Sequence, residues 1–101
     1  MSMEFLVGQV EQWSFDKGLD KADPSKQMLK VVEELGEVAG AMARGKRDEL
    51  IDGIGDVIVT VIILAQQHGL RIDDCLQVAY DEIKGRTGKM VDGVFIKSED
   101  L

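Results

Sequence analysis

The spacing of apolar residues predicts helices along most of the chain. The first spans residues 2–17, where apolar positions recur at helical intervals. The second is predicted over residues 24–44. Asp23 is a good cap for its first turn, and Pro24 has no N–H group to leave unpaired at the first helical position. Gly45 is expected to end this helix.

A third helix is predicted over residues 48–67 and a fourth over residues 73–85. The third contains "VIVTVIILA", which resembles a buried strand, but its apolar pattern continues too long for a strand. A helix that is apolar on nearly every side needs nearly complete burial. We therefore expect the third helix to pack against a partner subunit as well as against its own chain.

The C-terminal residues 86–101 contain too many glycines for a helix. Their "MVDGVFIK" segment fits either a short hairpin around Asp92-Gly93 or an arm that crosses an interface. The predicted fold is all-α: a single domain over residues 1–101, with a four-helix bundle and an irregular C-terminal arm. A unit of this size has a marginal core, so we expect a homodimer or homotetramer to complete it.

Charge and composition exclude several classes of protein. The net charge of −7 offers no basic surface for a phosphate backbone, so no nucleic-acid binding is expected. The longest apolar run, residues 57–65, is far shorter than the ~20 residues of a membrane span, and the N-terminus is unlike a signal peptide. The single Cys75 is expected to be a small buried residue in a reducing compartment. These features predict a soluble cytoplasmic protein.

The second predicted helix carries an acidic cluster, Glu33, Glu34 and Glu37. At 100° per residue these side chains gather opposite a broad apolar face. That face consists of Met28, Val31, Val32, Leu35, Val38, Ala39 and Met42. Gly36 and Gly40 flank the acidic side, and each costs roughly 1 kcal/mol relative to alanine within a helix. Their presence indicates that a ligand or another backbone comes close.

The third predicted helix carries a second acidic stripe. Glu49, Asp52 and Asp56 are spaced i, i+3 and i+7, and Gly53 leaves room beside them. Asp56 stands in apolar sequence, where an unpaired carboxylate is costly to bury. Two facing acidic stripes predict a divalent cation, Mg²⁺ or alternatively Mn²⁺, with phosphates completing its shell. The competing interpretation is a structural ion pair between Asp56 and a lysine such as Lys84.

At these residues the chain resembles the MazG-like nucleoside triphosphate pyrophosphohydrolases, an all-α superfamily. "EELGE" at 33–37 matches the family's EExxE, and "GDVIVTVI" from Gly55 matches the segment of its second acidic motif. The tail from Asp81, "DEIKGRTGKMVDGVF", resembles the substrate-contacting end of short members. The similarity extends from about Trp13 to Phe95.

The resemblance implies roles for the acidic residues. It places metal ligands at Glu34, Glu37 and Asp56, and it makes Glu33 the candidate to orient or deprotonate the attacking water. The family's second motif is usually ExxD, but Gly53 stands where its glutamate is expected. We favour Asp52 as the substitute, with Glu49 as the alternative. Asp81 or Glu82 on the fourth helix is a further candidate for the metal shell.

The resemblance also implies contacts with the nucleotide. Lys84, Arg86 and Lys89 are candidates to bind the phosphate tail, although a cationic cluster favoured by the helix dipole explains them equally well. Trp13 is a candidate to stack on a base, and the competing interpretation is a core tryptophan. His68 is expected only to end the third helix.

The implied activity is Mg²⁺-dependent hydrolysis of nucleoside or deoxynucleoside triphosphates to the monophosphate and pyrophosphate. One alternative is a relative that acts on phosphoribosyl-ATP, although the missing ExxD glutamate and the long tail argue mildly against it. The other is a non-enzymatic helical oligomerisation module whose carboxylates only solubilise its surface.

Overall fold

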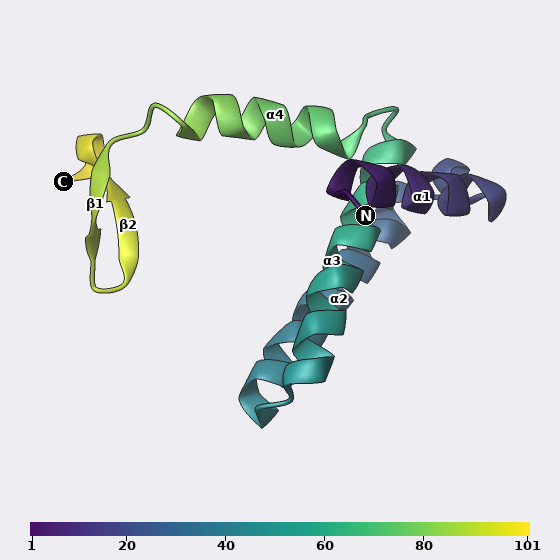
Figure 1. The fold of residues 1–101 in the computed structure, drawn as a ribbon, viewed down its shortest axis with the longest axis horizontal. Helices are drawn as coiled ribbons and strands as arrows, with labels where there is room; N and C mark the ends of the chain where they lie inside the picture. Colours follow the sequence, from purple (N-terminus) through teal and green to yellow (C-terminus); the bar gives the residue numbers. More distant parts are fainter.

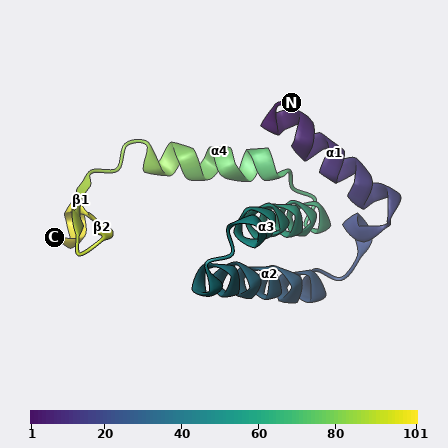
Figure 2. The ribbon, with the colours of Figure 1, turned by 60° about the horizontal axis from the view of Figure 1, so that its bottom comes forward.

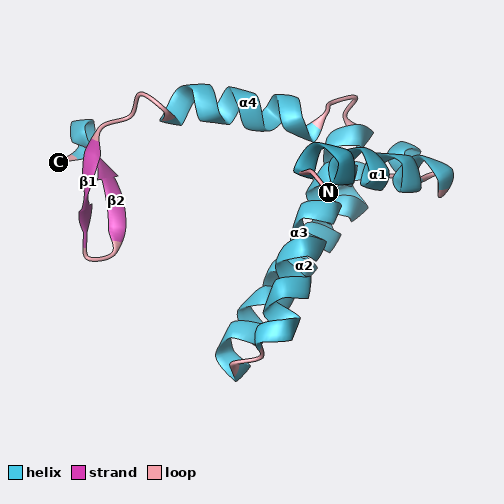
Figure 3. Cartoon of the chain, in the orientation of Figure 1, coloured by secondary structure: helices cyan, strands magenta, loops and turns pink.

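Four α-helices and one β-hairpin make up the chain in a computed structural model that describes residues 1–101 (Figure 3). The elements are α1 (Met3–Asp16), α2 (Pro24–Arg44), α3 (Arg47–Gln67), α4 (Ile72–Ile83), β1 (Gly88–Val91) and β2 (Val94–Lys97), with short 3₁₀ turns at Leu19–Lys21 and Ser98–Asp100. The predicted all-α class is confirmed. None of the helices combines the length and the apolar character that crossing a bilayer requires.

The ends of α2 follow the signals in its sequence. The Asp23 carboxylate accepts a hydrogen bond from the backbone N–H of Ser25 at 2.9 Å, and Pro24 opens the helix. Hydrogen bonds from the hydroxyl and the N–H of Ser25 lower the pKa of Asp23, because they favour its charged form. Gly45 adopts a φ of 65°, in the left-handed region that glycine enters without strain.

Helices α2 and α3 lie side by side as an antiparallel pair, and α1 crosses one end of it (Figure 1). The small core at these contacts contains Val7, Val31, Ala41, Ile62, Ile63 and Ala65. Glutamine side chains connect the elements: Gln27 donates to the Thr60 carbonyl at 3.0 Å, and Gln67 donates to the Leu19 carbonyl at 3.0 Å. The α2–α3 pair is therefore the packed centre of the chain.

Helix α4 and the hairpin extend away from that centre (Figures 1 and 2). The radius of gyration is 16.2 Å, compared with about 13 Å for a compact domain of this length. No residue of α4 is buried. The prediction of a buried Cys75 is therefore wrong, because this cysteine lies on α4 and is exposed.

The C-terminal segment is a regular hairpin, so the predicted irregular arm is wrong and the hairpin alternative is confirmed. Strand β1 pairs antiparallel with β2, with Val91 opposite Val94. Asp92 and Gly93 form the turn with φ angles of 51° and 80°, as the favoured two-residue hairpin turn requires. A side chain at Gly88 would collide with the Ile96 carbonyl, so glycine is needed there.

Much of the apolar surface of α2 has no partner within the chain. Helix α3 covers one edge of the broad apolar face, at Val31 and Val38, together with the adjacent Ala41, and leaves most of the face exposed. We call this uncovered part the apolar ridge: Met28, Val32, Leu35 and Met42, which are 47%, 55%, 50% and 66% exposed. On α3, Ile51 and Ile54 are likewise exposed. A single chain therefore leaves exposed much of the apolar surface of α2 and α3 that their composition predicts to be buried.

We expect a leucine at position 53 to destabilise the protein. A Cβ atom on Gly53 would lie 3.1 Å from Cγ2 of Val38, so a larger side chain forces α2 and α3 apart. Overpacking of this kind costs roughly 1–3 kcal/mol. Gly55→Leu on the same helix is the matched control, because a Cβ there meets open space. Urea denaturation at fixed protein concentration measures both, and equal stabilities of the two variants would contradict the close approach.

Candidate functional site

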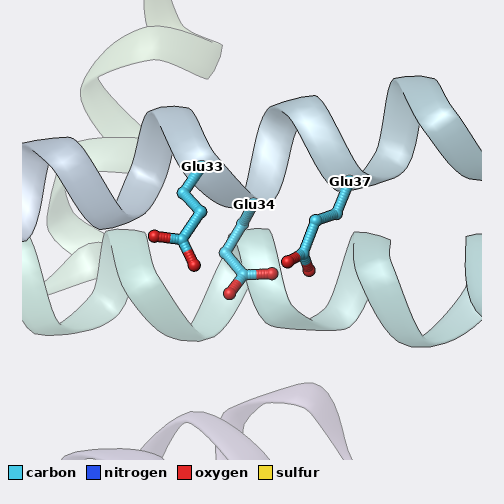
Figure 4. A group of neighbouring side chains, drawn as sticks. All are labelled: Glu33, Glu34 and Glu37. Atoms are coloured by element: carbon cyan, nitrogen blue, oxygen red, sulfur yellow. The ribbon is translucent and has the colours of Figure 1, made fainter.

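Three glutamates of α2 form the first half of the site. Glu33, Glu34 and Glu37 project to one side of the helix, toward α3 (Figure 4). One carboxylate oxygen of each lies within 4.8 Å of the others. Such spacing suits several oxygen ligands around one hard cation, and without a cation it places like charges close together.

Helix α3 supplies the second half. The two helices border a polar cavity of about 500 Å³ with no hydrophobic residue in its lining. The lining residues are Glu33, Gly36, Glu37, Gly40 and Arg44 from α2, and Glu49, Asp52, Gly53 and Asp56 from α3. The structure thus brings together the two acidic stripes that the sequence predicts to face each other.

Glu34 lies between the helices and not on the outer acidic side. Its side chain is partly buried, and its Oε2 atom is buried without a hydrogen-bond partner. The pKa of Glu34 is raised by this burial first, and then by contact with Glu37 and the negative charges of Glu37, Asp56 and Glu33. The prediction that Glu34 points opposite the apolar face is wrong, because at 100° per residue Glu34 lies only 60° from Val31 and 40° from Val38 around α2, at the edge of the face that α3 covers. A bound cation would supply the partner that Oε2 lacks.

The glycines of the cavity differ in what they make room for. Gly53 allows α3 to approach Val38 of α2, since a Cβ there would lie 3.1 Å from a Val38 methyl group. Gly36 has no neighbour within 4 Å of its Cβ position and leaves the cavity open. At Gly40 the same position is 3.0 Å from Nη1 of Arg44, so this glycine makes room for the arginine.

Arg44 is the cavity residue that the sequence analysis did not single out. Its Nη2 atom lies 2.7 Å from Oε2 of Glu49 across the helix pair. A signal was present in the sequence, because Arg44 follows Glu37 by seven residues and Gly40 by four. It therefore lies on the same stripe of α2.

The other candidate residues lie outside the cavity in a single chain. Asp81 accepts hydrogen bonds from Gln77 of the same helix at 3.0 Å and from Lys84, the C-cap of α4, at 3.0 Å. Lys84, which caps the end of α4, is therefore paired with Asp81, and the structural pair between Lys84 and Asp56 does not form within one chain. Arg86 pairs with Glu82 of the same segment at 3.5 Å. These residues lie outside the cavity because α4 points away from α2 and α3 after Gln67.

Two further candidates are on elements remote from the cavity lining. Lys89 is in β1, which lies beyond the end of α4 (Figure 1). Trp13 is in α1, and 50% of it is exposed, so the core interpretation of this tryptophan is wrong for the single chain. Neither residue lines the cavity.

Comparisons with known proteins assign the chain to a family. Residues 23–91 match the MazG nucleotide pyrophosphohydrolase domain, and this range contains every residue that lines the cavity. The chain is also 38% identical, over 76 residues, to a protein of Haemophilus phage HP1 (strain HP1c1) described as "Uncharacterized 18.2 kDa protein in rep-hol intergenic region".

That alignment covers 74% of this chain but only 45% of the phage protein, so the chain spans less than half of its relative. No solved structure is a significant match. The domain match alone covers about two thirds of the sequence and includes both helices that carry the acidic residues. The chain belongs to the MazG nucleotide pyrophosphohydrolase family.

Proposed function

We propose that the protein hydrolyses nucleoside or deoxynucleoside triphosphates to the monophosphate and pyrophosphate, with Mg²⁺ as the cofactor. The observation that carries this proposal is the convergence of carboxylates from α2 and α3 on one polar cavity. Family membership supports the same reaction class. The proposed place of action is the cytoplasm, where nucleoside triphosphates occur.

The carboxylates that line the cavity, together with Glu34 beside them, form a donor set that fits a hard divalent cation. We assign Glu34, Glu37, Asp52 and Asp56 as its ligands, with Mn²⁺ able to replace Mg²⁺. Asp52 fits as the substitute for the missing ExxD glutamate, because it lines the same cavity as Asp56. When bound, the cation neutralises phosphate oxygens and lowers the pKa of a water molecule. Glu49 is the alternative ligand; in this chain it is paired with Arg44.

Glu33 has the position expected of the residue that orients the attacking water. Its carboxylate lines the cavity, and its contact with Lys30, at 3.7 Å, is an exposed pair of little energetic weight. A water held there can pass a proton to Glu33 as it attacks the phosphorus. The unburied position of Glu33 then allows the proton to leave to solvent.

The proposed assembly is a homodimer or homotetramer that covers the apolar ridge of α2. Four large apolar side chains, each about half exposed or more, form a stripe at helical spacing, which is typical of a helix–helix interface. The same assembly is needed if Lys84, Arg86 and Lys89 are to reach phosphate groups, because in one chain they lie outside the cavity. Stacking of Trp13 on a base depends on assembly for the same reason.

The first prediction concerns activity. We expect Mg²⁺-dependent pyrophosphate release from at least one member of a panel of NTPs, dNTPs and phosphoribosyl-ATP. Glu37→Gln and Asp56→Asn should lower kcat/KM at least ~100-fold, since even residues outside the ligand shell of a metal site typically contribute 10–100-fold. Glu99→Gln, in the exposed 3₁₀ turn Ser98–Asp100 outside the cavity, is the control and should keep its activity. No pyrophosphate from any substrate would reject the enzyme in favour of a non-enzymatic module.

The second prediction concerns stability without metal. Below the ordinary Glu pKa of 4.5, Glu34 is protonated in the folded and unfolded chains alike. As pH rises through its raised pKa, the folded protein must accept a charge that the unfolded chain accepts more easily, so stability falls. Glu34→Gln should therefore raise the Tm of the metal-free protein at about pH 8, and this gain should disappear toward about pH 4.

In the same thermal scan, added Mg²⁺ should reverse the order of the Tm values of the wild type and Glu34→Gln. It should raise the Tm of the wild type, because it binds the folded state, and it should raise that of Glu34→Gln much less. Glu99→Gln, outside the cavity, should behave as the wild type throughout. An equal response of Glu34→Gln and the wild type to both pH and Mg²⁺ would remove Glu34 from the proposed ligand set.

The third prediction concerns assembly. Placing lysines at positions 35 and 42 puts two charges on the apolar ridge, and the oligomer should dissociate toward monomers. Light scattering after size-exclusion chromatography measures the mass directly. Gln12→Lys, on the exposed surface of α1 beside Asp16, is the control and should keep the wild-type mass. A wild type that is monomeric at all concentrations would contradict the proposed interface.

A further inference from the structure

Arg44 is the single positively charged residue in the lining of the acidic cavity. Of the nine lining residues, five are carboxylates and three are glycines. The phosphate chain of a nucleoside triphosphate is itself strongly negative, so this cavity repels it unless cations intervene. Divalent ions neutralise the phosphate oxygens near the carboxylates, and the remaining oxygens need donors from the protein.

The structure makes specific room for the Arg44 side chain. The guanidinium lies over Gly40, one turn earlier on α2, where a Cβ would approach Nη1 to 3.0 Å. On its other side Nη2 meets Glu49 of α3 at 2.7 Å. The carboxylate of Glu49 thus holds the guanidinium beside the cavity, and a side chain at position 40 would crowd it.

A stronger ligand can replace Glu49 as the partner of Arg44. The Arg44 and Glu49 side chains are 58% and 56% exposed, and solvated pairs of this kind contribute little to stability. A guanidinium has five N–H donors in a planar fork that matches phosphate oxygens, so a phosphate group offers it more hydrogen bonds. The neighbouring Lys30 contacts Glu33 but does not line the cavity.

We propose that Arg44 binds the phosphate chain of the substrate, and that Glu49 holds its guanidinium in place while no nucleotide is bound. The inference rests on the proposed function and names a substrate-binding residue for it. In that reaction the water oxygen bonds to the α-phosphorus while the bond to the bridging oxygen breaks. This oxygen leaves with the pyrophosphate, and the water proton passes to Glu33. The positively charged guanidinium of Arg44 can stabilise the negative charge that develops on the leaving pyrophosphate.

Binding of inorganic triphosphate tests this role without any hydrolysis or base recognition. Isothermal calorimetry with Mg²⁺ present compares wild type, Arg44→Ala, Arg44→Lys and Gly40→Ala. We expect Arg44→Ala to weaken binding at least tenfold and Arg44→Lys to restore part of it. Gly40→Ala should fall between wild type and Arg44→Ala, because it displaces the guanidinium and retains its charge.

Arg47→Ala is the matched control, since it removes the same charge three residues away and outside the cavity lining. It should change the affinity less than twofold. Unchanged binding by Arg44→Ala, or equal weakening by Arg47→Ala, would overturn the proposal, as would a wild type that binds no triphosphate. Arg44-dependent binding by a protein that hydrolyses no nucleotide would uphold the role of Arg44 and reject the proposed activity.

Discussion

Electrostatic repulsion between the carboxylates of α2 and α3 is the constraint on which the site depends. Five carboxylates line one cavity, and Glu34 lies beside them between the helices. One arginine is the sole cation in that lining. The α2–α3 pair keeps these charges close because Gly53 allows α3 to approach Val38. The pKa of Glu34 is raised first by its burial and then by Glu37, Asp56 and Glu33, and its Oε2 atom has no hydrogen-bond partner.

The surface of helix α2 consists of three strips with different roles. One strip, with Val31 and Ala41, packs against α3 and forms part of the core. The strip on one side of it carries the acidic residues of the cavity, and the strip on the other side is the apolar ridge. The packed strip, the acidic strip and the apolar ridge therefore keep fixed positions relative to one another on one helix. The ridge in particular has a fixed position relative to the acidic cavity.

The remote position of α4 and the hairpin has a consequence for the site. These elements carry cations that pair among themselves in one chain, as Lys84 does with Asp81 and Arg86 with Glu82. Their contacts are exposed and solvated, so they do not fix the helix against the rest of the chain. The acidic cavity thus needs no part of α4 for its geometry, whereas the proposed phosphate contacts from Lys84, Arg86 and Lys89, which follow α4, depend on the proposed assembly.

The sequence by itself determined the helices, their ends and the turn of the hairpin. Asp23, Pro24, Gly45 and Asp92-Gly93 act through local hydrogen bonds and φ angles, which depend on a few neighbouring residues. It also determined that acidic residues of two helices share stripes, since helical periodicity fixes which residues lie on one side. The family resemblance rested on these same local motifs.

Only the tertiary structure decided which edge of the apolar face α3 covers, and this placed Glu34 between the helices. It also decided that Arg44 reaches Glu49 and that Lys84 does not reach Asp56. Helical periodicity gives the angle of a side chain around its own axis, but not the rotation of one helix against the next. That rotation follows from packing contacts such as Gly53 against Val38, between residues that are distant in the sequence.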